Sequence, residues 1–160
     1  MFVSLGSNKI AVIAKASTSQ DEIVKRYIAD NWQIDVPSNW QHQEEEDRIM
    51  FYDPVSNGAL VISSFREDEP INDDYLEDML EDHLDADAQL YDENCGDFSG
   101  VSCCYDDEQE YWCEWYVFTE NVMLFVTYNC PLEHAGEEDD VIDSMLESLT
   151  LITKTEPVLH

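Results

Sequence analysis

The sequence has few basic residues, and one long segment has none. Of 160 residues only seven are Lys or Arg, and neither occurs from Glu67 to Thr153. DNA, RNA and anionic membranes are recognised mainly through basic side chains that neutralise phosphate. The shortage of such side chains therefore argues against nucleic acid or a membrane surface as a partner.

Long apolar runs and a cysteine framework are also missing. No stretch approaches the roughly 20 apolar residues of a membrane-spanning helix. The short apolar run at 10–16 has no basic cluster before it, so we expect a strand there and no signal peptide. Five cysteines are an odd number without regular spacing, so they cannot all pair within one chain. The expected location is the reducing cytoplasm.

Acidic residues are abundant. The 37 Asp and Glu give a net charge of −30, and 27 of them lie between Glu67 and Thr153. Hydrophobic residues (44%) and aromatics (11%) are nevertheless too frequent for a disordered chain. No repeat or linker marks a boundary, so we expect residues 1–160 to form a single domain. Such charge attracts a basic protein or a cation, or serves solubility alone.

Three helices are predicted from capping residues and apolar spacing. The first, at about 19–30, has a capping-box pattern at Ser19–Glu22 followed by apolar residues at helical spacing. The second follows Asn72, whose side chain can cap it, and has an apolar stripe between positions 76 and 84. The third begins within 136–140 and docks through a stripe between positions 141 and 149.

The remaining apolar segments predict an antiparallel sheet. After the strand at 10–16 come a short strand before Pro37, a hairpin and a three-stranded meander. Their predicted ranges are 32–36, then 49–52 with 59–65, then 97–105, 110–118 and 122–130. We therefore expect an α+β fold, with a mainly antiparallel sheet of about six strands and helices packed on it in a sandwich-like arrangement.

Two short motifs resemble the PsbP-like family of small α+β sandwich proteins. They are Trp-Gln-Ile-Asp-Val-Pro-Ser-Asn-Trp at 32–40, and Phe-Tyr-Asp-Pro at 51–54 followed by Gly-Ala-Leu-Val-Ile-Ser at 58–63. With the order of elements, the resemblance covers roughly residues 31–152. That family includes a photosystem extrinsic subunit, a nuclear-import Ran-binding factor and bacterial proteins, some of them adaptors for secreted effectors. The resemblance implies a binding or scaffolding role without catalysis, and it transfers no site residue.

The cysteines show no metal-binding spacing. No CxxC pair occurs among Cys95, Cys103, Cys104, Cys113 and Cys130, so we interpret them as buried structural thiols and expect no metal or cofactor. In the predicted meander, Tyr111 lies level with Cys104 on one side and Cys130 on the other. Cys113 lies one row along on the same face, and Cys103 points to the opposite face.

Catalytic and calcium patterns are also weak. Cys104 and His134 could act as a nucleophile and base, but no motif places them together. His83 is expected near the end of the second helix, where a protonated imidazole suits the helix dipole. The acidic stretch from Asp85 does not form an EF-hand loop, because Leu90 and Gly96 stand where that loop requires Gly and Glu.

The other face of the meander is the candidate partner-binding surface. It would carry Trp112, Glu114, Tyr116, Phe118, Met123 and Phe125, with Tyr105 on the neighbouring strand. If a helix covers these side chains, they are core. If the face stays partly open, aromatic and Met side chains among carboxylates form a surface suited to protein recognition.

The function predicted from these patterns is a non-enzymatic binding module of adaptor, chaperone or immunity type, whose acidic surface engages a basic protein. Two alternatives stay open. One is a small hydrolase that uses a carboxylate or a thiol, which requires a pocket with convergent polar groups. The other is an acidic protein with no specific charge-mediated partner. The patterns do not predict an oligomeric state.

Overall fold

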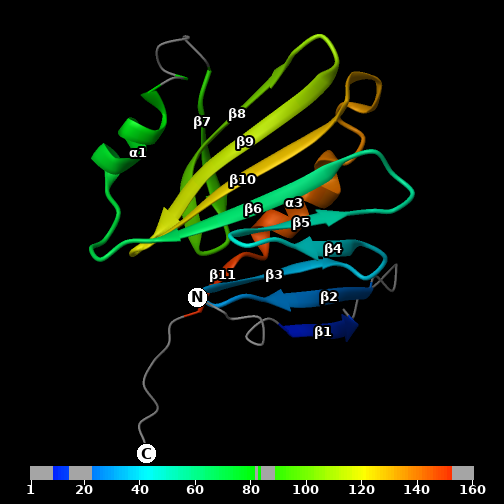
Figure 1. Ribbon diagram of the computed structural model, residues 1–160, viewed down its shortest axis with the longest axis horizontal. Coiled ribbons are helices and arrows are strands. Elements are labelled where there is room, and N and C mark those ends of the chain that lie inside the picture. The colour runs from blue at the N-terminus through cyan, green and yellow to red at the C-terminus, as the bar shows by residue number, and fades with distance from the viewer. Residues whose placement is uncertain (1–8, 15–22, 82, 84–88, 153–160) are drawn as a thin grey trace, which may run out of the picture.

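The computed structural model describes residues 9–14, 23–81, 83 and 89–152, and Figure 1 shows two antiparallel sheets with short helices. The smaller sheet has the order β1 (Lys9–Ala14), β2 (Ile23–Ile28), β3 (Trp32–Pro37), β11 (Thr150–Leu151). The larger has the order β4 (Gln41–Glu44), β5 (Arg48–Tyr52), β6 (Ala59–Arg66), β10 (Val122–Pro131), β9 (Glu110–Thr119), β8 (Phe98–Asp106), β7 (Tyr91–Cys95).

The protein is mostly β, so the predicted α+β fold with helices on a six-stranded sheet is wrong. In the part of the chain that the structure describes, the α-helices are α1 (Asp73–Met79) and α3 (Asp139–Glu147), and η2 (Leu132–His134) is a short 3-10 helix. None of the described helices is long and apolar enough to cross a membrane.

The predicted N-terminal helix at 19–30 is also wrong, because β2 occupies residues 23–28. The capping-box residues 19–22 lie outside the described residues. β2 contains Ile, Val and Tyr, whose branched or aromatic side chains favour strands. It also pairs with β1 on one side and β3 on the other. Hydrogen bonding along both edges outweighed the local helical spacing.

Most other predicted elements are confirmed. In β3, Trp32, Ile34 and Val36 are buried in strict alternation. The hairpin β5–β6 and the meander β8–β9–β10 form with the expected strand neighbours, although the β8–β9 register differs from the predicted one by two residues. Asn72 caps α1 by accepting a hydrogen bond from the Tyr75 backbone N–H at 3.0 Å. The strands β4, β7 and β11 were not predicted, since they are short and β4 and β7 are mainly polar.

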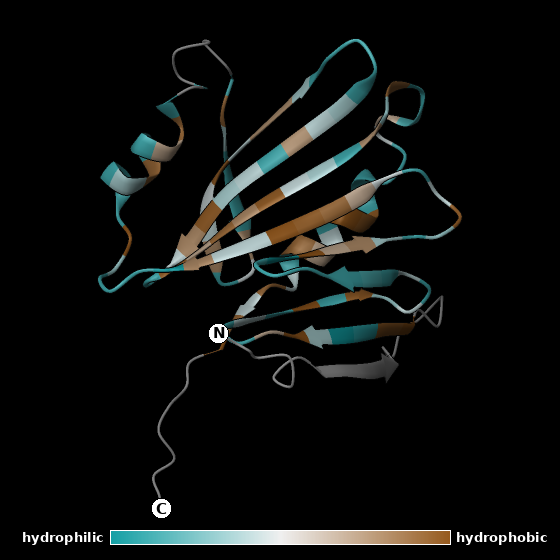
Figure 2. Ribbon diagram, in the orientation of Figure 1, coloured by the Kyte–Doolittle hydropathy of each residue, from teal (hydrophilic) through white to brown (hydrophobic). Residues whose placement is uncertain are grey.

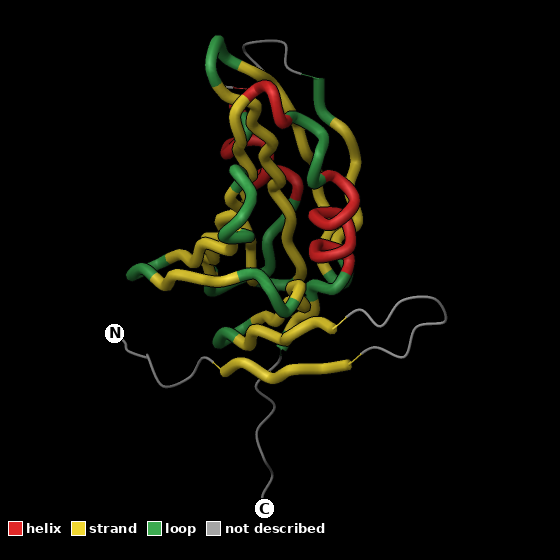
Figure 3. Tube along the Cα trace, turned by 90° about the vertical axis from the view of Figure 1, so that its right-hand side faces the viewer, coloured by secondary structure: helices red, strands yellow, loops and turns green. Residues whose placement is uncertain are grey.

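One core lies between the two sheets and α3. It is formed by the buried residues of β3, one face of the seven-stranded sheet and the apolar side of α3, including Ile34, Leu124 and Met145. A second cluster lies on the opposite face of that sheet, where Leu76 and Leu80 pack near Tyr116 and Met123. We call this second face the outer face, because Leu76 of α1 packs on it away from the main core. Figure 3 shows the helices, in red, against the strands.

Hydropathy follows this arrangement. Figure 2 shows apolar residues along the central strands and hydrophilic residues over much of α1 and the turns. The buried stripe of α3 is Ile142, Met145 and Leu146, as its spacing predicts. Each helix thus has one apolar side on a sheet and a charged side in solvent.

The turn between β7 and β8 connects the two sheets. The Asp97 backbone N–H donates to the Leu149 carbonyl at 2.9 Å, and the Leu151 N–H of β11 donates to Asp97 Oδ2 at 2.9 Å. Gly96 makes this approach possible. Its φ is +64°, and a Cβ there would lie 1.9 Å from the Leu149 carbonyl oxygen.

We expect Gly96→Ala to destabilise the protein much more than Gly136→Ala. Both glycines have positive φ, which costs an L-residue about 1–2 kcal/mol. At Gly136 the nearest atom to an added Cβ is 3.8 Å away, whereas at Gly96 the backbone must move, adding about 1–3 kcal/mol. Urea unfolding of the two variants measures the difference. Equal losses would contradict this account of the turn.

Candidate functional site

The predicted binding patch lies on the outer face, and α1 covers part of it. Tyr116 and Met123 belong to the cluster under α1, and Glu114 is also buried. The side chains of Trp112, Phe118 and Phe125 are half-buried, and Tyr105 is 41% exposed. Both alternatives therefore apply in part, because the patch is core beneath α1 and open beside it.

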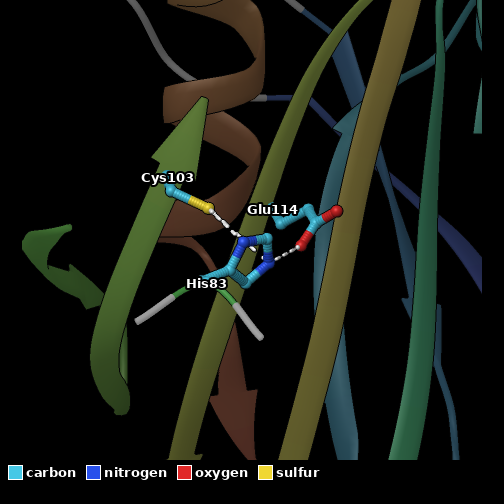
Figure 4. Close-up of side chains that lie close together, drawn as sticks. All are labelled: His83, Cys103 and Glu114. Atoms are coloured by element: carbon cyan, nitrogen blue, oxygen red, sulfur yellow. Dashed lines mark hydrogen bonds and ion pairs between the residues drawn. The ribbon is translucent and has the colours of Figure 1, made fainter. Parts of the chain in front are cut away.

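Within this patch the structure brings together a thiol, an imidazole and a carboxylate. Cys103 and Glu114 are direct partners across β8 and β9. His83 follows α1 in the chain, and Figure 4 shows its ring lying between them. The Cys103 Sγ lies 4.0 Å from both ring nitrogens, and the His83 Nε2 lies 2.8 Å from the Glu114 Oε1. We call these three residues the His83 cluster.

Two tyrosine hydroxyls hold the Glu114 carboxylate in place. The Tyr105 hydroxyl donates to Oε2 at 2.5 Å, and the Tyr116 hydroxyl donates to Oε1 at 2.6 Å. The Tyr116 oxygen also lies 3.1 Å from the His83 Nε2. Both carboxylate oxygens thus accept hydrogen bonds from the protein, which they need because Glu114 is only 9% exposed to water.

These contacts favour the charged form of Glu114. Burial alone would raise its pKa, but the hydrogen bonds from Tyr105, Tyr116 and His83, with the charge of His83, outweigh burial and lower it. The pKa of both tyrosines is raised, first by burial, then by the hydrogen bond that each donates to Glu114 and by the negative charge of Glu114. The tyrosines stay neutral donors around a buried anion.

At Cys103 the surroundings favour the neutral thiol and not the charged form. It is 2% exposed, and burial, followed by the charge of Glu114, raises the pKa of its thiol. Its sulfur lies equally far from both ring nitrogens, so it is not in line with either of them. The arrangement can hold a proton between His83 and Glu114, and it offers one nitrogen, one sulfur and one oxygen as ligand atoms.

A disulfide joins Cys104 to Cys113, with their Cα atoms 4.0 Å apart. The interpretation of all five cysteines as free thiols is wrong for this pair, whereas Cys95, Cys103 and Cys130 are free and buried. The predicted strand register explains the error. Tyr111 pairs with Cys130 as expected, but its partner on β8 is Asp106 and not Cys104, which lies opposite Cys113.

The pair Cys104 and His134, considered for catalysis, is not assembled. Cys104 is committed to the disulfide, so it is no nucleophile for His134, whose Nδ1 lies 3.1 Å from Glu137. Residues 85–88 of the acidic stretch considered for calcium lie outside the described residues. His83 was expected to interact only with the dipole of its own helix, but its ring also contacts Glu114 of β9.

Sequence reasoning placed Glu114 and Tyr116 in the patch but missed His83 and Cys103 as their neighbours. The only local signal was the alternation that puts Cys103 on the same face as Tyr105. A correct β8–β9 register would have placed Cys103 opposite Glu114. No pattern within the chain indicates that the segment after α1 returns to this point.

Comparisons with known proteins establish the fold alone. No model of a known protein family matches the chain, and no curated protein matches it. The chain is similar to a crystal structure from Bacteroides thetaiotaomicron VPI-5482 at 1.50 Å resolution, with a TM-score of 0.62 and 18% identity. The match covers 78% of this chain and 46% of that one, so this chain spans less than half of its neighbour's length. The resemblance to the PsbP-like family stays a prediction.

We expect Tyr116→Phe to destabilise the protein more than Tyr105→Phe. Each change removes one hydroxyl from Glu114, and a hydrogen bond to a charged group contributes about 1.5–3 kcal/mol. Water can replace the hydroxyl of the exposed Tyr105 but not that of the buried Tyr116. Urea unfolding at neutral pH compares the two. A larger loss for Tyr105→Phe would show that the Oε2 contact, and not the Oε1 contact, holds the carboxylate.

Proposed function

We propose that this chain is a non-enzymatic protein-binding module, of adaptor, chaperone or immunity type, that engages a basic partner through its acidic surface. The observation that carries this proposal is the absence of Lys and Arg from the segment 67–153, where most of the carboxylates lie. Among the described residues, the ion pairs that involve Lys or Arg are Arg26–Asp35 and Arg48–Glu45. Both lie outside the segment 67–153, which holds 27 carboxylates.

The surface around α1 combines charge with apolar contact area. Four of the seven α1 residues are exposed carboxylates: Asp73, Asp74, Glu77 and Asp78. Beside them Met79 is 36% exposed, and on the outer face Phe65 and Tyr105 are 40% and 41% exposed. Aromatic and Met side chains supply much of the energy of protein interfaces, and the surrounding charges select the partner.

A basic partner would gain mainly in rate of association. Uncompensated carboxylates create a negative potential that steers a cationic surface toward α1, and this attraction falls as salt is added. Carboxylates buried against Lys or Arg of the partner would then add charge-assisted hydrogen bonds. An adaptor or immunity protein with this surface therefore binds fast at low salt.

We expect Glu77→Gln with Asp78→Asn to weaken binding of the basic partner, and Glu46→Gln with Asp47→Asn to leave it nearly unchanged. Each exposed ion pair lost costs about 0.2–1 kcal/mol. Both variants lose the same charge, but the second pair lies in the turn between β4 and β5. The measurement is affinity capture at low salt with elution by a salt gradient, followed by the dissociation constant of the captured protein.

The outcome separates a specific surface from a general one. A single basic protein that elutes at a defined salt concentration, and earlier from the α1 variant alone, supports the proposal. A smear of abundant basic proteins that responds equally to both variants would favour an acidic protein without a specific partner. Stability that climbs steadily from low to molar salt would support the same alternative.

A thiol hydrolase is the second candidate, because the structure places Cys103 and His83 within 4.0 Å. Such an enzyme needs an accessible thiolate beside its base. Cys103 is buried, and its pKa is raised and not lowered. A described surface hollow lies elsewhere, at the β8–β9 turn, lined by Asp106, Asp107, Glu108, Gln109 and Leu132. These features favour binding over thiol catalysis.

We expect iodoacetamide to alkylate Cys103 more slowly in the native protein than in urea at the same pH, and at least as fast as Cys95. Burial raises the pKa of both thiols, and for Cys95 it raises it to about 12. Mass spectrometry of digests at successive times gives the rate at each cysteine. A native Cys103 that reacts faster than the unfolded thiol would favour the hydrolase.

A further inference from the structure

We propose that His83, Cys103 and Glu114 form a binding site for a divalent transition-metal ion of the zinc class. Their ligand atoms all lie within 4.8 Å of one another, and they offer one imidazole nitrogen, one sulfur and one carboxylate oxygen. Zinc binds these three donor types, usually in tetrahedral geometry. The site is independent of the acidic surface around α1 and of any protein partner.

The present distances require only a small adjustment. Metal–ligand bonds of about 2.0–2.3 Å place neighbouring tetrahedral ligand atoms about 3.3–3.6 Å apart. The Cys103 Sγ is 4.0 Å from either ring nitrogen, and the His83 Nε2 is 2.8 Å from the Glu114 Oε1. The sulfur–nitrogen distance must shorten and the nitrogen–oxygen distance lengthen by roughly half an ångström. The sulfur–oxygen distance, which is within 4.8 Å, must shorten by up to about an ångström, and side-chain rotation can supply these changes.

The backbone already positions two of the three ligands. Cys103 and Glu114 are register partners on β8 and β9, so their side chains leave the same face from directly opposite positions. His83 approaches from the segment after α1, as Figure 4 shows. A metal ion would therefore join that segment to the sheet at a defined point.

Charge also favours a cation at this point. Glu114 is a buried carboxylate in a stretch without Lys or Arg, and its ion-pair partner is His83. A divalent ion would balance one carboxylate and one thiolate. On binding, Cys103 releases its thiol proton to solvent, and a protonated His83 also releases one ring proton to solvent, so that the freed nitrogen binds the ion.

The surrounding tyrosines fit the role of second-layer donors. The Tyr105 and Tyr116 hydroxyls donate to the two oxygens of Glu114, and such contacts orient metal-binding carboxylates. Calcium and magnesium prefer six or more oxygen ligands, whereas Glu114 is the single carboxylate of the cluster. The site should thus select a zinc-class ion even on a surface rich in carboxylates.

The test is titration of the metal-free protein, with its Cys104–Cys113 disulfide intact, with Co²⁺ in a large excess of Mg²⁺, which occupies diffuse acidic sites. We expect one equivalent to bind, with a thiolate-to-cobalt charge-transfer band in the near ultraviolet and visible bands of tetrahedral intensity. One equivalent of Zn²⁺ should remove both. Cys103→Ser should abolish the charge-transfer band, and His83→Gln should weaken binding at least about tenfold.

Two matched variants control for other donors. Cys130→Ser removes a buried free thiol elsewhere, and His134→Gln removes a half-buried histidine beside Glu133 and Glu137. Both should keep the full signal. If Cys103→Ser does not fold, His83→Gln decides, because the His83 side chain is 22% exposed and lies outside the main core.

The proposal is overturned by any of three results: no charge-transfer band in the wild type, the same affinity in His83→Gln, or binding that excess Mg²⁺ abolishes. The capture experiment is carried out with metal-free protein, so none of these results bears on the basic partner. Both measurements are made on Cys103→Ser. Loss of the cobalt signal with retention of the basic partner separates the metal site from the partner-binding surface.

Discussion

Burial on both faces of the seven-stranded sheet is the constraint on which the rest of the structure depends. One face packs on α3 and the smaller sheet, and the other packs partly on α1. The turn at Gly96 keeps the first contact close, since its backbone meets the Leu149 carbonyl directly. Because α1 is only seven residues long, it cannot cover the whole outer face. The proposed partner surface includes α1 and the exposed side chains beside it, whereas the proposed metal site lies in the buried His83 cluster.

The same residue type has two different environments in this protein. Exposed carboxylates on α1 are solvated, and their charge acts at long range on whatever approaches. Glu114 is instead enclosed by two tyrosines and a histidine, and these donors replace the water that it has lost. The first environment suits a macromolecular partner with many basic groups. The second suits a single small cation, so a partner and a metal ion need not compete.

The fold was partly predictable, and its errors have identifiable causes. Asn72 and the apolar stripe of α3 predicted two helices correctly, because caps and periodicity act locally. At β2 the local spacing suggested a helix, but pairing with strands on both sides decided otherwise. In the β8–β9 hairpin the predicted register was wrong by two residues. A two-residue shift keeps every side chain on its face but changes its neighbours, so the face of Cys103 was right and its partner was wrong.

By itself, the sequence determined the charge of the protein, the face of the meander on which each side chain lies, and the capped start of α1. These properties depend on composition and on interactions between residues near one another in the chain. Only the tertiary structure decided that Cys104 meets Cys113, that Cys103 lies opposite Glu114 and that His83 returns to contact both. Such contacts depend on strand register and on the path of the chain after α1. Both are set by packing of the whole domain, because no local pattern distinguishes one register from the next.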